Sequence, residues 1–199
     1  MQQIRVISRY TEKLAFQLLE LHQASLPNDI IPNLVLSYYK YLVSLMANRK
    51  YGLLLGVFKS KKLLGFCFVA YNHEILIKKI SEKKFFLLMS IFKFIFLKPQ
   101  LIIDLLGSVF GKVKLYEHLD FSRYPEIFVM CISENHRSKG IGSQLIKEIN
   151  ESLLAEGHQF LLVKTSSDRA ANFYLKEQFL CIGAQNRLTR KLKIFKRKL

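Results

Sequence analysis

The sequence feature that most constrains the fold is a glycine-containing turn between an apolar run and a helical one. Residues 127–132 are continuously apolar, as in a buried strand, while leucine and isoleucine recur at helical spacing over residues 145–154. The turn between them, residues 137–142, reads RSKGIG. A helix that begins here presents backbone N–H groups without intrahelical partners, together with the positive end of its dipole. The arrangement therefore predicts an anion site, for phosphate in particular.

The residues of this turn leave two interpretations open. Gly140 and Gly142 allow unusual backbone dihedrals and the close approach of a ligand, and Arg137 and Lys139 add positive charge. The same glycines equally suit a tight strand-to-helix connection that binds nothing. The turn is not a Walker loop, since it lacks the Gly-Lys-Ser/Thr ending, and Leu145 stands where a dinucleotide fingerprint has its third glycine.

Composition limits the class of protein and the kind of partner. A chain of 199 residues that is 50% hydrophobic can form one domain with a substantial core. Its formal net charge of +16 favours acidic partners: nucleic acid, an anionic membrane surface, or a phosphorylated ligand. The three cysteines lie far apart among apolar residues, which indicates core thiols in a reducing compartment. The histidines lack metal-ligand spacing and the first residues lack a signal-peptide pattern, so we expect a cytoplasmic protein without a metal.

The first 71 residues predict a strand, two helices and a hairpin. The strand covers residues 3–7, the first helix runs from a cap at Thr11 to about residue 24, and the second follows Pro32. The hairpin strands cover residues 52–58 and 63–71. Gly65 interrupts the second of these, which indicates a bulge or the close passage of another backbone.

Residues 72–120 predict a Phe-rich helical insertion. One helix is expected over residues 75–97, and Pro99 suits the start of another over residues 100–110. A membrane span is disfavoured, because Lys93, Lys98 and Asp104 interrupt the apolar run. The insertion either packs on the core or also offers residues 85–97 to a membrane or a second subunit.

From residue 125 the pattern becomes regular again. A strand (126–132), a helix (140–156) and a strand (160–164) form a β-α-β unit. A short helix (168–177), a strand (179–183) and a final basic strand within residues 187–199 follow.

Two segments of this region resemble a known family. The pattern Arg137-x-x-Gly140-x-Gly142 after its strand resembles the acetyl-CoA motif of the GNAT superfamily, the Gcn5-related N-acetyltransferases. Residues 170–174 (AANFY), followed by Phe179, resemble a second motif of that family. The resemblance covers residues 1–71 and 122–195. It implies an α/β fold of the α+β type, a mostly antiparallel twisted mixed sheet flanked by helices, as a single domain over residues 1–199 with the 72–120 insertion.

The resemblance also implies where acetyl-CoA binds. The pyrophosphate is expected on the turn and the pantetheine arm on the strand edge, with further contacts from the second motif. The expected residues are Arg137, Ser138, Lys139, Gly140, Ile141, Gly142 and Ser143 in the turn, Met130, Cys131 and Ile132 on the strand, and Ser167, Ala170 and Phe173. Two positions depart from the family: Ser167 replaces an Asn that contacts the cofactor, and Gln178 replaces a Gly.

Catalytic roles follow from the same resemblance. Glu126 matches the start of the fourth strand and is the leading candidate for general base, although a solvent-facing glutamate is nearly as good an interpretation. His73 and Glu74 are weaker candidates. Tyr174 matches the tyrosine that protonates the departing thiolate. Cys131 is expected to be a core residue, because no adjacent His or Lys activates it for an acyl-enzyme.

The expected activity is direct transfer of an acetyl group from acetyl-CoA to a primary amine. The net charge suggests a small anionic acceptor such as an amino sugar, carried for example on a nucleotide or as a lipid-linked glycan precursor, and a protein N-terminus or lysine is the alternative. A peripheral membrane or partner-binding module with weak catalysis, acting through residues 85–97, is an alternative of another class. A homodimer stays open, and specific nucleic-acid binding is not expected because no recognised module is present.

Overall fold

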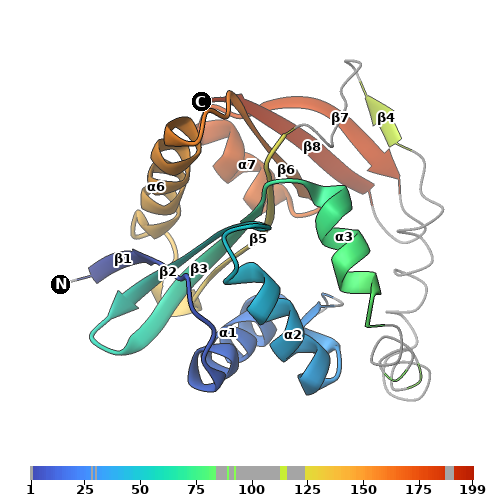
Figure 1. Cartoon of the computed structure of the whole chain (residues 1–199). Coiled ribbons are helices and arrows are strands. Elements are labelled where there is room, and N and C mark those ends of the chain that lie inside the picture. Colours follow the sequence, from blue (N-terminus) through green and yellow to red (C-terminus); the bar gives the residue numbers. More distant parts are fainter. Residues whose placement is uncertain are drawn as a thin grey trace.

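The computed structural model (Figure 1) describes residues 2–27, 29, 31–83, 89, 92, 113–115, 124–186 and 191–199. Its strands are β1 (Gln2–Val6), β2 (Gly52–Lys59), β3 (Lys62–Ala70), β4 (Val113–Leu115), β5 (Glu126–Ile132), β6 (Phe160–Thr165), β7 (Leu180–Asn186) and β8 (Lys191–Lys198). Its helices are α1 (Glu12–Ser25), α2 (Leu36–Met46), α3 (His73–Ser81), α6 (Ile141–Ala155) and α7 (Asp168–Lys176), with short 3-10 turns η1 (Ile31–Asn33) and η3 (Glu134–His136).

The strands form one mixed sheet, as the sequence predicts. In the described part of the chain its order is β1-β2-β3-β5-β6-β8-β7-β4. Every neighbouring pair is antiparallel except β5 and β6, which are parallel because α6 carries the chain across from one to the other. The predicted β-α-β unit is therefore confirmed, and it lies at the centre of the sheet.

Helices cover both faces of this sheet (Figure 1). On one face α1 and α2 pack on alternate residues of the hairpin, with Phe66 and Phe68 of β3 among the buried side chains. On the other face α6 and α7 pack on the intervening residues, including Cys67 and Val69. The period of two in β3 thus divides the core into two layers, each sealed by its own pair of helices.

A bulge opens the sheet at its parallel pair. In the β3–β5 register, Phe68 pairs with Val129 and Val69 pairs with Ile127, so Phe128 is an extra residue in β5. The parallel β5–β6 pairing covers Glu126 and Ile127 and then ends. Because a bulge bends its strand and increases the local twist, β5 diverges from β6 at this point. The two strands therefore enclose a wedge beyond residue 127.

Single residues explain where a helix begins and where a strand is interrupted. Thr11 caps α1 as predicted, since its hydroxyl oxygen accepts a hydrogen bond from Leu14 N at 3.2 Å. The bulge predicted at Gly65 is confirmed in β3, where Val57 pairs with Gly65 and the next pair joins Phe58 to Leu63. A Cβ atom at Gly65 would also lie 3.1 Å from the carbonyl oxygen of Cys131.

The region 72–120 differs from its predicted helices. The first helix begins at His73, two residues early, because the Asn72 side chain caps it by accepting from Ile75 N at 3.0 Å. It ends at Ser81, so the prediction of one continuous helix over 75–97 is wrong at that point. Residues 113–115 form strand β4, which pairs antiparallel with β7, so the segment is not wholly helical. The helix predicted over 100–110 lies outside the described residues.

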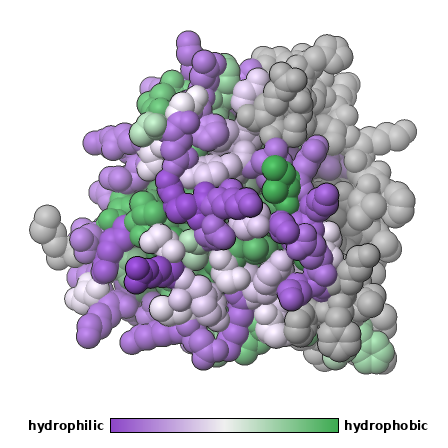
Figure 2. All heavy atoms as spheres, in the orientation of Figure 1, coloured by the Kyte–Doolittle hydropathy of each residue, from purple (hydrophilic) through white to green (hydrophobic). Residues whose placement is uncertain are grey.

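The surface seen in Figure 2 is largely hydrophilic, with apolar side chains in separate patches. Of residues 85–97 only Met89 and Phe92 are described, and both are exposed. None of the helices in the described ranges has the length and apolar character needed to cross a membrane.

Candidate functional site

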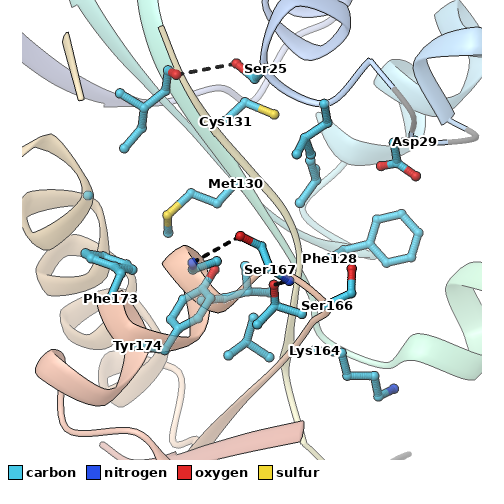
Figure 3. A pocket seen from close by; sticks show the side chains of 18 of the residues that line it. Ser25, Asp29, Phe128, Met130, Cys131, Lys164, Ser166, Ser167, Phe173 and Tyr174 are labelled. Carbon is cyan, nitrogen blue, oxygen red and sulfur yellow. Dashed lines mark hydrogen bonds between the residues drawn. The ribbon is translucent and has the colours of Figure 1, made fainter. Parts of the chain in front are cut away.

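The wedge between β5 and β6 opens into a cavity of about 1640 Å³ that is lined from both faces of the sheet. Figure 3 shows Met130, Phe173 and Tyr174 on one side of β5. Ser25, Asp29 and Phe128 lie on the other side. We call these the α6 half and the α1 half of the cavity. A single cavity that passes through a sheet in this way can hold two reactants on opposite faces.

The edge of β5 presents backbone groups to the wedge. Ser133 N donates to the β3 carbonyl of Leu64 at 2.8 Å, so residues at odd positions direct their N–H and C=O groups toward β3. Met130 and Ile132 direct theirs to the opposite edge. The carbonyl oxygen of Ile132 accepts from Arg137 Nε at 3.1 Å and from Ser25 Oγ at 3.4 Å. The N–H and C=O of Met130 face the wedge, where an amide-containing ligand can pair with them.

The N-terminus of α6 lies at the mouth of the α6 half. Gly140 adopts the left-handed conformation with φ of 78°, and a Cβ atom there would meet nothing within 4 Å. The first turn of α6 contains no acidic residue. An open helix N-terminus whose first turn carries no acidic residue of its own fits the phosphate groups of a coenzyme. The residues of the turn thus fit the group that the sequence motif implies.

The second glycine of the motif has a packing role. A Cβ atom at Gly142 would lie 2.9 Å from Cζ of Phe173. The glycine therefore lets α7 approach α6, and it places the Phe173 ring on the cavity wall. The sequence motif Gly140-x-Gly142 thus contains one glycine for backbone conformation and one for helix contact.

The predicted cofactor residues gather at this cavity with two exceptions. Met130, Cys131, Ile132, Arg137, Ser138, Gly140, Gly142, Ser143, Ser167, Ala170 and Phe173 all line it. The exceptions are Lys139, whose side chain is exposed, and Ile141, whose side chain is buried in the core under α6. Ile141 can contribute only its backbone N–H, and Lys139 only long-range charge.

Two of the hydroxyl groups in this set form hydrogen bonds within the protein. Ser167 caps α7, because its Oγ accepts from Ala170 N at 3.3 Å. Ser143 donates to the Glu177 carboxylate at 2.5 Å and so ties α6 to the end of α7. The capping role explains why a serine suits the position where the family has an asparagine.

Tyr174 lies at the bottom of the α6 half. Its ring packs against Phe173, Phe179 and Phe195. Burial, with smaller contributions from the thiols of Cys67 and Cys131, raises the pKa of Tyr174 well above its usual range. The phenol therefore keeps its proton and can act as a donor in the cavity.

Glu126 is buried where β5 and β6 part. Its Oε2 accepts from Lys164 Nζ at 2.9 Å and lies 3.3 Å from Nδ1 of His73. The prediction that treats Glu126 as a solvent-facing strand end is wrong, since only 4% of the residue is exposed. His73 joins it at the cavity wall, whereas Glu74 is exposed on α3 and does not line the cavity.

Cys131 is a core residue, as the sequence predicts. Its side chain is buried on the α1 face, and burial raises the pKa of its thiol far above the ordinary value. A thiol in this state is a poor nucleophile, which favours direct transfer over an acyl-enzyme.

The sequence reasoning missed Asp29, which lines the α1 half of the cavity, and the buried residues His22 and Tyr39 behind it. The Asp29 carboxylate lines the cavity and contacts His22, whose ring is fully buried. Asp29 lies in a breaker segment that carries no motif. A histidine near the end of an amphipathic helix was the one available signal, and it does not by itself identify a partner.

Comparison with known proteins agrees with this geometry. A family model described as an acetyltransferase (GNAT) domain matches residues 100–179. No curated protein sequence gave a significant match. Solved structures do match, at identities low enough to show the fold alone.

Three of these solved structures show how similar their folds and sequences are to this chain. A polyamine N-acetyltransferase from Drosophila melanogaster superposes with a TM-score of 0.61 at 11% identity, over 100% of each chain. An N-acetyltransferase from Staphylococcus aureus gives 0.60 at 12% identity, over 100% of this chain and 98% of the other. The ribosomal-protein-S18-alanine N-acetyltransferase from Escherichia coli gives 0.56 at 11% identity, over 100% and 94%.

These findings supply independent support for the two sequence motifs. The matched family model includes both Arg137–Gly142 and Ala170–Tyr174, and the sheet that carries them has the GNAT arrangement. Residues 100–179 thus match the GNAT acetyltransferase domain, and the fold of the whole chain is similar to that of GNAT-family acetyltransferase structures.

Proposed function

We propose that this protein transfers an acetyl group from acetyl-CoA directly to a primary amine. The observation that carries the proposal is the parting of β5 and β6 after Ile127, which creates one cavity open to both faces of the sheet. A coenzyme in the α6 half and an amine in the α1 half can meet at the edge of β5. No covalent enzyme intermediate is needed in this arrangement.

The α6 half supplies the groups that bind a coenzyme. Backbone N–H groups at the start of α6 receive the pyrophosphate, and the basic side chains that line this half are Arg137, Arg169 and Lys176. The C=O of Met130 accepts from an N–H of the amide-containing arm, which leaves the Met130 N–H for the thioester. Arg137 also holds the turn against β5, since its Nε donates to the Ile132 carbonyl.

The chemistry needs a proton removed from the amine and one given to the thiolate. Acetyl-CoA supplies an activated acyl carbon as a thioester. An alkylammonium has a pKa of about 10.4, so the amine must lose a proton before it attacks. Glu126 is the proposed acceptor of that proton, directly or through water, and the Met130 N–H stabilises negative charge on the carbonyl oxygen. Tyr174, kept protonated by burial, donates to the leaving sulfur and regains a proton from the attacking nitrogen, which carries an extra proton after attack.

The residues of the α1 half say less about the acceptor than those of the α6 half say about the coenzyme. The described acidic and basic residues lining the α1 half are Asp29, His73, Glu126 and Lys164, and the last two pair with each other. This lining gives no support to the anionic acceptor suggested by net charge. The other basic residues of the cavity, Arg137, Arg169 and Lys176, lie in the α6 half, where the coenzyme is expected. A protein N-terminus or lysine remains an alternative acceptor. Membrane contact through residues 85–97 and dimer formation stay predictions.

Calorimetry and a transfer assay test the proposal. We expect CoA and acetyl-CoA to bind the wild-type chain with a stoichiometry of one. Tyr174→Phe should lower kcat by about 100-fold while leaving CoA affinity within twofold, since only the proton donor is lost. Tyr71→Phe is the matched control, because the Tyr71 hydroxyl donates to Glu156 outside the cavity. Absence of CoA binding to the folded wild-type protein would overturn the proposal.

A further inference from the structure

One face of α7 carries two basic side chains on the wall of the α6 half. Arg169, Phe173 and Lys176 follow one another at intervals of four and three residues, so they share one face of the helix. All three line the cavity, and both basic side chains are exposed. This face of α7 therefore presents two positive charges to the cavity, one on each side of the Phe173 ring.

The described part of the protein does not neutralise these two charges. No hydrogen bond or ion pair joins Arg169 or Lys176 to another described residue. The carboxylates next to them in the sequence have partners elsewhere: Asp168 accepts from Lys193 Nζ at 2.8 Å, and Glu177 accepts from a hydroxyl group of α6 at 2.5 Å. Adjacent side chains on a helix also point in different directions. The two cations of this face are therefore available to an anionic ligand.

The two cations lie on either side of the contact between α7 and the start of α6. A Cβ atom at Gly142 would lie 2.9 Å from Cζ of Phe173, so the first turn of α6 touches the middle of α7. With about 3.6 residues in a helical turn, Arg169 lies about one turn before Phe173 and Lys176 about one turn after it. A ligand whose diphosphate binds at the start of α6 therefore has a basic side chain of α7 on each side.

Coenzyme A carries a third phosphate group that the start of α6 does not account for. Its diphosphate suits the backbone N–H groups of that helix, whereas the third phosphate is a monoester on the 3′ oxygen of the ribose. A phosphate monoester has a second pKa of about 6, so its charge is close to −2 at pH 7. Hydrogen bonds from charged donors are the strong ones for such a group, and arginine can form two of them in parallel. Two cations beside the diphosphate site match this group in charge.

We propose that Arg169 and Lys176 bind the 3′-phosphate of the coenzyme and thereby select coenzyme A over its dephospho form. The diphosphate lies at the N-terminus of α6, and the nucleotide end of the coenzyme lies along the α7 face. This inference rests on the proposed function, since it assigns a further subsite for the same coenzyme in the same cavity.

The test compares two coenzymes that differ only in the 3′-phosphate. CoA and dephospho-CoA are titrated into the full chain by calorimetry at about 0.15 M salt, where distant surface charges are screened. We expect the wild-type protein to bind CoA about tenfold more tightly, because only CoA gains the charge-assisted hydrogen bonds. Arg169→Gln/Lys176→Gln should abolish most of this preference while dephospho-CoA affinity stays within about twofold, and each single variant should lie between.

Lys147→Gln is the matched control for each single variant. Lys147 is an exposed lysine of α6 that does not line this cavity, so its substitution lowers the net charge by the same amount and leaves the α7 face intact. It should keep the wild-type preference for CoA. Thermal denaturation of every variant shows that the protein is folded, as expected for substitutions at exposed positions.

Phosphorus NMR tests whether the contact is direct. The monoester gives a signal apart from those of the diphosphate, and its chemical shift follows its protonation. Nearby cations favour the dianion, so binding to the wild-type protein should lower the pKa of the 3′-phosphate by about one unit from its usual value of about 6. In Arg169→Gln/Lys176→Gln the bound phosphate should titrate as it does in free CoA.

The outcomes distinguish this inference from the proposed function. If both coenzymes bind the wild-type protein equally, or if the double variant keeps the preference, the inference is overturned while the proposed function stands. Equal weakening of both coenzymes in the double variant would show that the two cations act on the diphosphate, which also overturns it. Binding of neither coenzyme to the folded wild-type protein would overturn both proposals.

Discussion

At the scale of single residues, Glu126 combines a structural ion pair with the proposed role of general base. It joins Lys164 at the point where β5 and β6 part, so the ion pair links the two strands at the last parallel pair. The same carboxylate lines the cavity, within reach of His73. A general base in this place is positioned by the strand pairing rather than by a loop.

Substitutions at Glu126 and Lys164 separate the structural role of the ion pair from the proposed role of general base. Glu126→Gln leaves the largely buried Lys164 ammonium without its charged partner and should cost about 3 kcal/mol in the free energy of unfolding. It should also lower kcat by about 100-fold, as expected for loss of a base. Lys164→Met keeps the carboxylate and should retain most of kcat. Urea denaturation and steady-state assays measure the two effects, and an unchanged kcat in Glu126→Gln would exclude the base role.

The three cysteines give a second prediction at this scale. Cys67 and Cys131 are buried, and burial raises the pKa of both thiols, whereas Cys181 is exposed. Iodoacetamide at pH 8 should therefore modify Cys181 in the native protein and all three thiols in guanidinium chloride. Intact-mass spectrometry counts the adducts. Rapid native labelling of Cys131 would contradict the assignment of that residue to the core and reopen a covalent route.

At the scale of elements, the contact between α6 and α7 shapes the cofactor half. Gly142→Ala places a methyl group 2.9 Å from the Phe173 ring, which must move into or away from the cavity. We expect CoA affinity to fall at least fivefold, with a loss of about 1 kcal/mol in stability. Isothermal titration and thermal denaturation measure the two quantities.

Gly157→Ala is the control for that change. Gly157 lies after α6 with φ of 82° and open space around its Cβ position, so alanine there introduces backbone strain of about 1 kcal/mol without touching the cavity. It should destabilise the protein to a similar degree and leave CoA affinity unchanged. If both variants weaken CoA equally, the effect would come from general destabilisation and not from Phe173.

The elements also show what sequence can and cannot predict. The β5–turn–α6 unit was predictable because strand periodicity, the glycine turn and helical spacing agree locally. The wedge was not, since the bulge at Phe128 is visible only when the β3 register is known. The start of α3 depended on a cap at Asn72, and β4 depended on pairing with a strand about 70 residues later. The place of Asp29 at the cavity wall, beside His22, depends on tertiary contacts.

At the scale of the whole molecule, the sheet divides the protein into two layers joined through one gap. The α1–α2 layer and the α6–α7 layer share the strands β2, β3 and β5 but otherwise form separate clusters. Burial of aromatic residues in both layers links stability to protonation, because Tyr39 lies in one cluster and Tyr174 in the other.

This link predicts a loss of stability in alkali. Burial raises the pKa of Tyr39 and Tyr174 far above the ordinary value of about 10, which both residues regain on unfolding. Their stabilising contribution is complete below pH about 10. Above it the unfolded chain releases protons that the folded chain retains, so the free energy of unfolding falls by about 1.4 kcal/mol per tyrosine and pH unit. Guanidinium denaturation at pH 8, 10 and 11 measures the slope. Tyr39→Phe/Tyr174→Phe should flatten it by about twice that amount, and an identical slope in wild type and double variant would refute the linkage.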